Sequence, residues 1–357
     1  MYAFLADVHL GVKLPRDVFF DSLNYLFDII KKHDEECKQI FVCGDLFDHR
    51  LNPSELTFAA EYLVKLICNK CRKDGGNVPV TMIHGTYSHD QEQYMIFIPL
   101  IEKMTGVRVR YIQNVSSFKI DDDRIKCLAI PQEYGDIDYT KAFSDKYDII
   151  IGHGPVSSET KSPCPVGSSE ILMSADQLGK ISNVCVFGHY HEYTDFGANV
   201  FYAGSNLRWK YGEPSKKVFL ICDDNWNVTA YDNPFAVEYI AIQVNDIEEL
   251  REALSQDITT PHRFTIHAND INTINEIHAL ANVYRNNKNI SFRILSDMDR
   301  EDSTMLWKDS TNVPDASIEP IPSLITYIKD RYNVDSESFI KDYENKIKQK
   351  EGTNNEQ

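Results

Sequence analysis

The sequence lacks a long hydrophobic segment and a leader of the kind that directs export. No apolar run among its 357 residues approaches the roughly 18 residues needed to span a membrane. The first residues carry Asp7 and no basic cluster, which is atypical of a secretory signal peptide. We therefore expect a protein that works in the cytoplasm and does not associate with membranes.

Positive charge is also scarce. The 37 Lys and Arg residues are outnumbered by 54 Asp and Glu residues, which gives a formal net charge of −17. Binding of nucleic acid usually depends on Lys and Arg contacts to phosphate. This balance argues against a chain that grips nucleic acid on its own, although bound metals or a partner protein can supply local positive charge.

A complete cysteine-based zinc site is missing as well. The eight cysteines include one C-x-x-C pair, Cys68 and Cys71, whereas a structural zinc site needs a second pair of this kind. Most of the other cysteines lie in apolar runs, so we expect reduced and mostly buried thiols.

What the sequence does contain, up to about residue 232, is an alternation of apolar runs and amphipathic stretches. Short apolar runs predict strands, and longer stretches with apolar residues at helical spacing predict helices. The predicted strands cover 2–8, 39–45, 78–85, 125–131, 147–153, 184–189, 200–204 and 217–223, and the predicted helices cover 16–36, 54–73 and 94–106. Strands that first alternate with helices and then follow one another quickly predict a layered α/β sandwich.

The pattern changes in the last third of the chain. Residues 235–297 alternate strand, helix, strand, helix and strand, which predicts a small α/β domain after a first domain of residues 1–232. Residues 298–322 are polar and contain prolines, so we interpret them as a linker. Residues 323–349 predict two short amphipathic helices, and residues 350–357 predict a disordered tail.

Polar clusters rich in Asp and His follow several of the predicted strands. Open α/β sheets place their sites just outside the carboxyl ends of strands, so we expect these clusters to meet at one edge. The candidate ligands are Asp7, His9, Asp45, His89, His153, His189 and His191. A lone Asp-x-His is usually surface polarity, but five clusters at five strand ends favour a centre with two divalent metals.

These clusters carry a resemblance to a known family. "DVHLG", "GDLFDHR", "HGTYSHD", "IGHG" and "GHYHEY" resemble, in this order, the five motifs of the calcineurin-like metallophosphoesterases. Within that superfamily, "ADVHLG", "GDLFDHRLNPS" and "FYAGSNLRW" are similar to the SbcD/Mre-type DNA nuclease subunit of bacteria and phages. The resemblance covers roughly residues 1–210 and implies an α/β/β/α sandwich. The domain at 235–297 resembles the family's DNA-capping domain in position and pattern only.

The resemblance implies a role for each ligand. Asp7, His9 and His191 would hold the first metal, and Asp45 would bridge both metals. His153 and His189 would hold the second metal. A bridging hydroxide would attack the phosphodiester, and His89 would act near the leaving oxygen, so Asp45 and His89 are the expected catalytic residues. The mixed O/N donor set suits Mn²⁺, the usual activator of the family, or Fe²⁺, and suits Mg²⁺ less well.

The loop from His84 to Asp90 departs from the family pattern G-N-H-D. Gly85, His89 and Asp90 are kept, but two residues are added, and Ser88 stands where the family has the Asn that binds the second metal. Ser88 is our candidate for this ligand, and Thr86 or a loop carbonyl is the alternative. The departure also leaves open a weakly bound second metal or an inactive site. Because the other six ligands are present, we favour a working variant.

Four further residues are candidates for contact with substrate. His49 and Arg50 follow the second motif, where they would meet a phosphate, and a surface role is equally compatible with their position. Tyr87 and Tyr190 lie inside the ligand loops, where aromatic rings stack on bases or wall a cleft.

The resemblance predicts a Mn²⁺-dependent DNA exo- and endonuclease that acts in recombination or repair, in the cytoplasm of a bacterium or of a phage-infected host. It also predicts a homodimer and an SbcC-type coiled-coil ATPase partner, which the helices at 323–349 would contact. A phosphatase or phosphodiesterase acting on proteins or small phosphoesters is the first alternative. A non-catalytic scaffold with a degenerate metal site is the second.

Overall fold

The computed structural model describes most of the chain up to Leu295. The described residues are 1–12, 14–91, 93–132, 139–158, 161, 173–208, 213, 216–238, 240–256, 258, 262–268, 270–287 and 290–295. The predicted linker at 298–322, the helices at 323–349 and the tail at 350–357 lie outside these residues. Among the described residues, no helix is both long and apolar enough to cross a membrane.

The chain divides into two compact units. Among the described residues, the first contains Met1–Leu207 and Lys216–Phe235, and the second contains those from Ala236 to Leu295 together with a short segment that begins at Arg208. The sequence predicts the two domains at 1–232 and 235–297.

The first unit contains two six-stranded sheets. The first sheet has the order β14-β13-β1-β2-β3-β4, in which β1 to β4 run parallel and β13 and β14 are antiparallel additions. Its strands are β1 (Tyr2–Leu5), β2 (Gln39–Cys43), β3 (Val80–Ile83), β4 (Arg110–Ile112), β13 (Val218–Cys222) and β14 (Val228–Asp232). Strand β1 therefore lies between β2, which follows it in sequence, and β13, which comes some two hundred residues later.

The second sheet has the order β11-β12-β10-β7-β6-β5. Its strands are β5 (Ser116–Ile120), β6 (Ile125–Ile130), β7 (Tyr147–His153), β10 (Ser182–Gly188), β11 (Thr194–Gly197) and β12 (Val200–Tyr202). The central strands β6, β7, β10 and β12 are parallel, and β5 and β11 close the edges as antiparallel hairpin partners. A short parallel pair, β8 (Val156–Ser157) and β9 (Met173–Ser174), lies apart from both sheets in the strand pairing.

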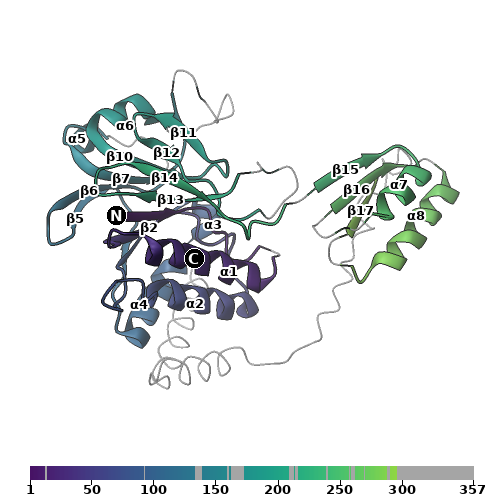
Figure 1. Cartoon of the computed structure of the whole chain (residues 1–357), viewed down its shortest axis with the longest axis horizontal. Helices are drawn as coiled ribbons and strands as arrows, with labels where there is room; N and C mark the ends of the chain where they lie inside the picture. The colour runs from purple at the N-terminus through teal and green to yellow at the C-terminus, as the bar shows by residue number, and fades with distance from the viewer. Residues whose placement is uncertain are drawn as a thin grey trace, which may run out of the picture. The chain divides into compact units, whose positions relative to one another are not determined.

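The two sheets pack face to face and helices cover the outer faces (Figure 1). Helices α1 (Arg16–Lys32), α2 (Pro53–Ile67) and α4 (Gln93–Thr105) lie on the first sheet, and α5 (Thr140–Phe143) and α6 (Ala175–Ile181) lie on the second. The core between the sheets is mainly apolar and includes Phe4, Phe41, Ile83, Cys127, Ile149, Ile151, Val184, Val186 and Leu220. The predicted α/β/β/α sandwich is confirmed.

Two predicted helices end earlier than their periodicity suggested. Helix α1 stops at Lys32, because His33 adopts an extended conformation. Helix α2 begins at a capping box formed by Asn52 and Glu55 and stops at Ile67. The amide of Asn69 donates to carbonyl oxygens on both sides of the turn, at Leu66 and Val78, and so holds the chain in a bend where helix 54–73 was expected to continue.

The second unit is a small parallel α/β layer. Strands β15 (Ile240–Val244), β16 (His262–His267) and β17 (Ile290–Leu295) pair in sequence order, connected by α7 (Ile247–Leu254) and α8 (Ile271–Tyr284). The side chains of Asp246 and Asp270 cap the two helices. Alternate strand residues such as Val244, Phe264 and Ile266 are buried against the helices, which gives this unit its own core.

Candidate metal centre

The predicted ligands lie at the carboxyl ends of strands from both sheets of the first unit. Asp7 and His9 follow β1, Asp45 follows β2, His89 follows β3, His153 is the last residue of β7, and His189 and His191 follow β10. Because β1 to β3 are parallel, and β7 and β10 are parallel, each sheet delivers its ligands to one edge.

Three groups of possible metal donors form at this edge. They are Asp7, His9 and His191; His9, Asp45 and His89; and Asp7, Asp45 and His153, and in each group the donor atoms lie within 4.8 Å of one another. Each pair of groups shares a residue, so the donors form one continuous cluster. Asp7, His9, Asp45 and His153 are almost completely buried.

The backbone is strained at three of these positions. Asp7, His9 and Asp45 have φ values of 48°, 50° and 46°, in the left-handed region that residues other than glycine seldom adopt. The two loops lie side by side, with the amide of Asp7 donating to the carbonyl oxygen of Gly44 (3.2 Å) and that of His9 to Asp45 (3.1 Å). The strained turns aim the side chains at one point instead of alternating them across a strand.

Close approach of the loops requires two glycines. A Cβ atom on Gly44, which has a φ of 80°, would lie 2.2 Å from Nδ1 of His153. A Cβ atom on Gly85 would lie 2.1 Å from the backbone nitrogen of Asp45. The loops after β2 and β3 and the end of β7 thus meet only because these positions carry no side chain.

Hydrogen bonds orient the imidazoles. Nδ1 of His153 bonds to the carbonyl oxygen of Cys43 (2.8 Å), which leaves Nε2 to face Asp45 Oδ1 at 3.3 Å. Nδ1 of His9 lies 3.2 Å from Asp48 Oδ1. The backbone N–H of His189 donates to Asp7 Oδ1 (2.9 Å). Partners of this kind fix which ring nitrogen faces an ion.

The charges at this edge perturb one another strongly. Burial raises the pKa of Asp7 to about 8, and the charge of Asp45 adds to the shift. Burial also opposes ionisation of Asp45, but the imidazoles of His153 and His9 hold the pKa of its carboxyl below the usual range. Burial alone would lower the pKa of His153, yet Asp45 and Asp7 raise it to about 9.

The pKa of His189 falls to about 4, because burial and the positive charge of His153 disfavour its imidazolium form. Two buried carboxyl groups beside several imidazoles form a donor set that fits a divalent transition metal, since a bound cation would replace the protons that His153 and Asp7 hold in its absence.

A comparison with known families agrees with this geometry. The family model described as calcineurin-like phosphoesterase matches residues 2–193, a span that contains all the predicted ligands. The chain belongs to the calcineurin-like phosphoesterase family. A search of curated proteins found no match. The family and the donor cluster together make this protein a metal-dependent phosphoesterase.

In this phosphoesterase the loop after β3 brings Thr86, and not Ser88, against the cluster. The backbone N–H of Thr86 donates to Asp45 Oδ1 (2.5 Å), and its hydroxyl lies 3.1 Å from Asp45 Oδ2. Ser88 is exposed on the short helix α3 (Tyr87–Asp90). The buried Asp90 holds the loop in place, because its carboxylate accepts from the amides of Gly85 (2.7 Å) and Phe47 (3.1 Å).

His89 turns back towards the cluster from the same helix. Its Nδ1 bonds to the backbone carbonyl oxygen of Asp48, and its ring packs edge-on against that of His9 with centroids 4.8 Å apart. His84, which precedes the loop, bonds instead to the hydroxyl of Tyr111 (2.7 Å), away from the donor groups.

Asp48 contacts three of the predicted site residues and is not among the candidates from the sequence. Its carboxylate contacts His9 and His49, and its carbonyl oxygen positions His89. Burial opposes its ionisation, but the hydrogen bonds from His9 and His49 lower its pKa to about 2. The only signal in the sequence is its place three residues after Asp45, inside the quoted motif "GDLFDHR".

The four residues expected to contact substrate differ in their exposure and in their partners. Both ring nitrogens of His49 have carboxylate partners, Asp48 Oδ2 at 3.0 Å and Glu55 Oε2 at 3.1 Å. Arg50 is exposed and the side chain of Tyr87 is 59% exposed. Tyr190 packs its ring edge-on against His189 (4.8 Å) and so forms part of the wall beside the donor cluster.

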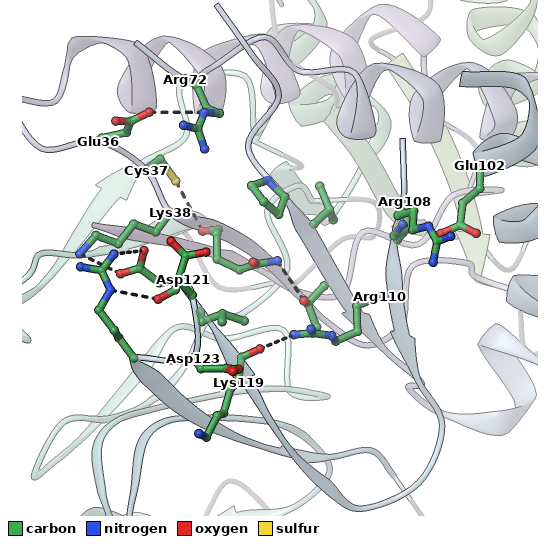
Figure 2. A pocket seen from close by; sticks show the side chains of 18 residues that line it. Glu36, Cys37, Lys38, Arg72, Glu102, Arg108, Arg110, Lys119, Asp121 and Asp123 are labelled. Carbon is green, nitrogen blue, oxygen red and sulfur yellow. Dashed lines mark hydrogen bonds and ion pairs between the residues drawn. The ribbon is translucent and has the colours of Figure 1, made fainter. Parts of the chain in front are cut away.

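A second concentration of charge lies at the opposite end of the first sheet (Figure 2). It surrounds a pocket of about 1060 Å³ lined by the first residues of β2, β3 and β4, namely Gln39, Val80 and Arg110. Some of the cations here have carboxylate partners, such as Lys38 with Asp121 (3.7 Å), whereas Arg110 donates to the carbonyl oxygen of Lys119. None of the three donor groups found among the described residues lies at this end.

Proposed function

We propose that this phosphoesterase is a DNA nuclease subunit of the SbcD/Mre type, which hydrolyses phosphodiester bonds by exo- and endonuclease action with two Mn²⁺ ions. The observation that carries the proposal is the continuous donor cluster. In it, Asp7, His9 and Asp45 each belong to two of the three donor groups. A cluster of this extent has donors for two neighbouring ions, as in-line hydrolysis of a phosphodiester by the two-metal mechanism requires.

Each residue of the donor cluster has its own role in the proposed reaction. Asp7, His9 and His191 would hold the first ion, His153 and His189 the second, and Asp45 both. Bound metals supply a hydroxide nucleophile and neutralise charge on the phosphoryl oxygens. Nδ1 of His89 donates to the carbonyl oxygen of Asp48, so Nε2 would face the leaving oxygen. From the imidazolium form, in which both ring nitrogens carry a proton, Nε2 would give its proton to that oxygen, and the ring would keep the proton on Nδ1.

Three features support DNA over a small phosphoester as substrate. The motifs "GDLFDHRLNPS" and "FYAGSNLRW" are similar to those of the nuclease branch, and the chain carries a second α/β unit with its own core, for which a minimal phosphatase has no need. Exposed Tyr87 and Arg50 offer a ring and a guanidinium to bases and phosphate.

The proposal includes the partners that the resemblance implies. A formal charge of −17 suits a subunit that leaves much of the DNA grip to an SbcC-type coiled-coil ATPase. We also propose a homodimer that works in the cytoplasm in DNA recombination or repair, without membrane contact.

The test compares substrates under one metal condition. The full chain with Mn²⁺ would be assayed on linear duplex DNA, on single-stranded DNA and on p-nitrophenyl phosphate, with and without an SbcC-type partner. We expect cleavage of DNA that is lost in Asp45→Asn. Hydrolysis of the monoester without DNA cleavage would favour a phosphatase, and no hydrolysis of any substrate would favour a non-catalytic scaffold.

A further inference from the structure

We propose that Thr86 provides the neutral oxygen ligand of the second metal and that Gln132 positions its hydroxyl. This inference rests on the proposed two-metal function and concerns the loop in which the chain departs from its family. It assigns the ligand to a residue two positions before Ser88 and adds a partner from a distant strand end.

The hydroxyl of Thr86 meets three polar groups from the ends of three different strands. Oγ1 lies 3.1 Å from Asp45 Oδ2, 3.3 Å from His153 Nε2 and 2.9 Å from Gln132 Oε1. Gln132, which follows β6, is buried. The hydroxyl of Thr86 thus lies among polar groups of the donor cluster. Two of these groups, Asp45 and His153, are proposed ligands of the second ion.

The distances match those between neighbouring ligands of one ion. In an octahedral site with bonds of about 2.1 Å, adjacent ligand atoms lie about 3 Å apart. Thr86 Oγ1 is 3.1 Å from Asp45 and 3.3 Å from His153, and His153 Nε2 is itself 3.3 Å from the other carboxylate oxygen of Asp45. The hydroxyl, the imidazole and the carboxylate, which offers a different oxygen to each of the other two, therefore lie at the spacing expected of neighbouring ligands of one ion.

Gln132 sets the direction in which the hydroxyl of Thr86 donates its hydrogen bond. A threonine hydroxyl has one proton and two lone pairs, whereas the amide oxygen of Gln132 is only an acceptor. When a bound cation neutralises the charge of Asp45, the hydroxyl of Thr86 donates its hydrogen bond to Gln132 Oε1. A lone pair of Oγ1 then faces the ion. Gln132 is thus a positioning residue that acts through Thr86.

The two residues added to the loop explain why the ligand has moved. The chain needs Tyr87 and Ser88 to form the single turn of α3 that returns His89 to the cluster, and in this turn Ser88 faces solvent. Thr86 is the residue directly before the turn, where its N–H already donates to Asp45. Its β-branched side chain has few rotamers, so the hydroxyl is held towards the ion site at little entropic cost.

The experiment measures metal binding and not catalysis. Mn²⁺ would be titrated into the metal-free full chain by calorimetry, and the electron paramagnetic resonance spectrum would report whether the bound ions form a coupled pair. The variants are Thr86→Val, which keeps the shape and removes the hydroxyl, Thr86→Ser, which keeps the hydroxyl, and Ser88→Ala as the matched control in the same loop.

We expect the second Mn²⁺ to bind about 100-fold more weakly in Thr86→Val, with loss of the coupled-pair signal and an unchanged first site. Thr86→Ser and Ser88→Ala should keep both ions. Two ions bound with unchanged affinity in Thr86→Val would overturn the assignment, and loss of the second ion in Ser88→Ala would move the ligand to Ser88. If the wild type binds a single ion, the two-metal function itself fails, and the ligand assignment falls with it.

A double-mutant cycle tests the role of Gln132. Gln132→Leu should weaken the second ion by about 10-fold in the wild type and should have no further effect in Thr86→Val, because it acts only through the hydroxyl. An additional loss in the double variant would show that Gln132 binds the ion directly and would overturn its positioning role.

Discussion

The two ends of the first sheet carry similar side chains and use them differently. At the carboxyl end, Asp7 and Asp45 are buried, sit on strained backbone and perturb the pKa values of their neighbours. At the amino end, around the pocket of Figure 2, cations and carboxylates are partly exposed and paired, as in the 2.7 Å bridge between Arg124 and Asp121.

The difference shows what marks a functional end of a sheet. Exposed ion pairs contribute little and are screened by solvent, so their number reveals nothing about activity. Buried carboxylates that repel each other on strained backbone cost free energy, and such a cost is typical of a site that binds a cation. We therefore expect substitutions at the carboxyl end to have large effects and those at the amino end to have negligible ones.

The largest effect is expected for Asp45→Asn. Loss of the carboxylate shared by two donor groups should remove metal binding and lower phosphodiester hydrolysis by about 10⁴-fold or more. The measurements are the rate on bis(p-nitrophenyl) phosphate with Mn²⁺ and the metal content of the purified chain, with circular dichroism to show that the fold is kept. A variant that retains both ions and most of its activity would contradict the proposed centre.

His89→Ala should separate chemistry from metal binding. We expect activity to fall by about 10²- to 10⁴-fold, because the proton donor is lost, while the Mn²⁺ content stays that of the wild type. The same hydrolysis and metal assays apply. If the variant loses an ion, His89 is a metal ligand, as its place in a group with His9 and Asp45 also allows.

Asp48→Ala should have an intermediate effect. Its carboxylate orients His9, so the first Mn²⁺ should bind about 10- to 100-fold more weakly, whereas the backbone carbonyl that positions His89 remains. Calorimetry on the metal-free chain would measure this change, with His49→Ala as the control for the neighbouring contact of Asp48. Equal losses in both variants would argue against orientation of His9 as the cause.

The stability of the metal-free protein should fall as the pH rises from 6.5 to 8. The pKa of His153 is raised to about 9 and that of Asp7 to about 8, so in this range the folded state binds more protons than the unfolded state. As the pH rises, the stabilisation from protonated His153 is lost and the cost of ionising buried Asp7 grows, so both groups lower the stability. Thermal unfolding in a chelator at several pH values would measure the trend.

Bound Mn²⁺ should reverse this trend, because ionised Asp7 and neutral imidazoles bind the cation best. A metal concentration 100 times the dissociation constant adds about 2.7 kcal/mol to the free energy of unfolding. If the stability of the metal-free protein in the chelator rises with pH, His153 and Asp7 do not hold the extra protons that their surroundings indicate.

The smallest effects are expected at the amino end. Arg124→Ala removes the exposed bridge to Asp121 and should change the free energy of unfolding by less than about 1 kcal/mol, with no effect on hydrolysis or metal content. Urea unfolding and the hydrolysis assay would test this. A large loss of activity would mean that the pocket takes part in function, and the contrast between the two ends would have to be revised.

Much of the sandwich and its ligand edge follows from sequence patterns, because both depend on local rules. Apolar runs gave the strands, and the polar residues after them marked the edge at which parallel strands end. The helix ends were less predictable, since the bend after Ile67 depends on the side chain of Asn69 reaching Val78.

The contacts within the site were harder to predict, because they too depend on side chains that reach residues distant in the sequence. Whether Thr86 or Ser88 faces Asp45 depends on how Asp90 anchors the loop to Phe47, which no local pattern records. Gln132 is 46 residues from Thr86 and follows a strand of the other sheet, so only the packing of the two sheets brings them together.

The position of β1 has a consequence for synthesis on the ribosome. The strand that leads to Asp7 and His9 is paired on one side with β2 but on the other with β13, whose residues Val218–Cys222 are made much later. His153, His189 and His191 also emerge late. A growing chain therefore cannot assemble the centre before most of the first unit has left the ribosome, so a half-made protein carries no competent hydrolase.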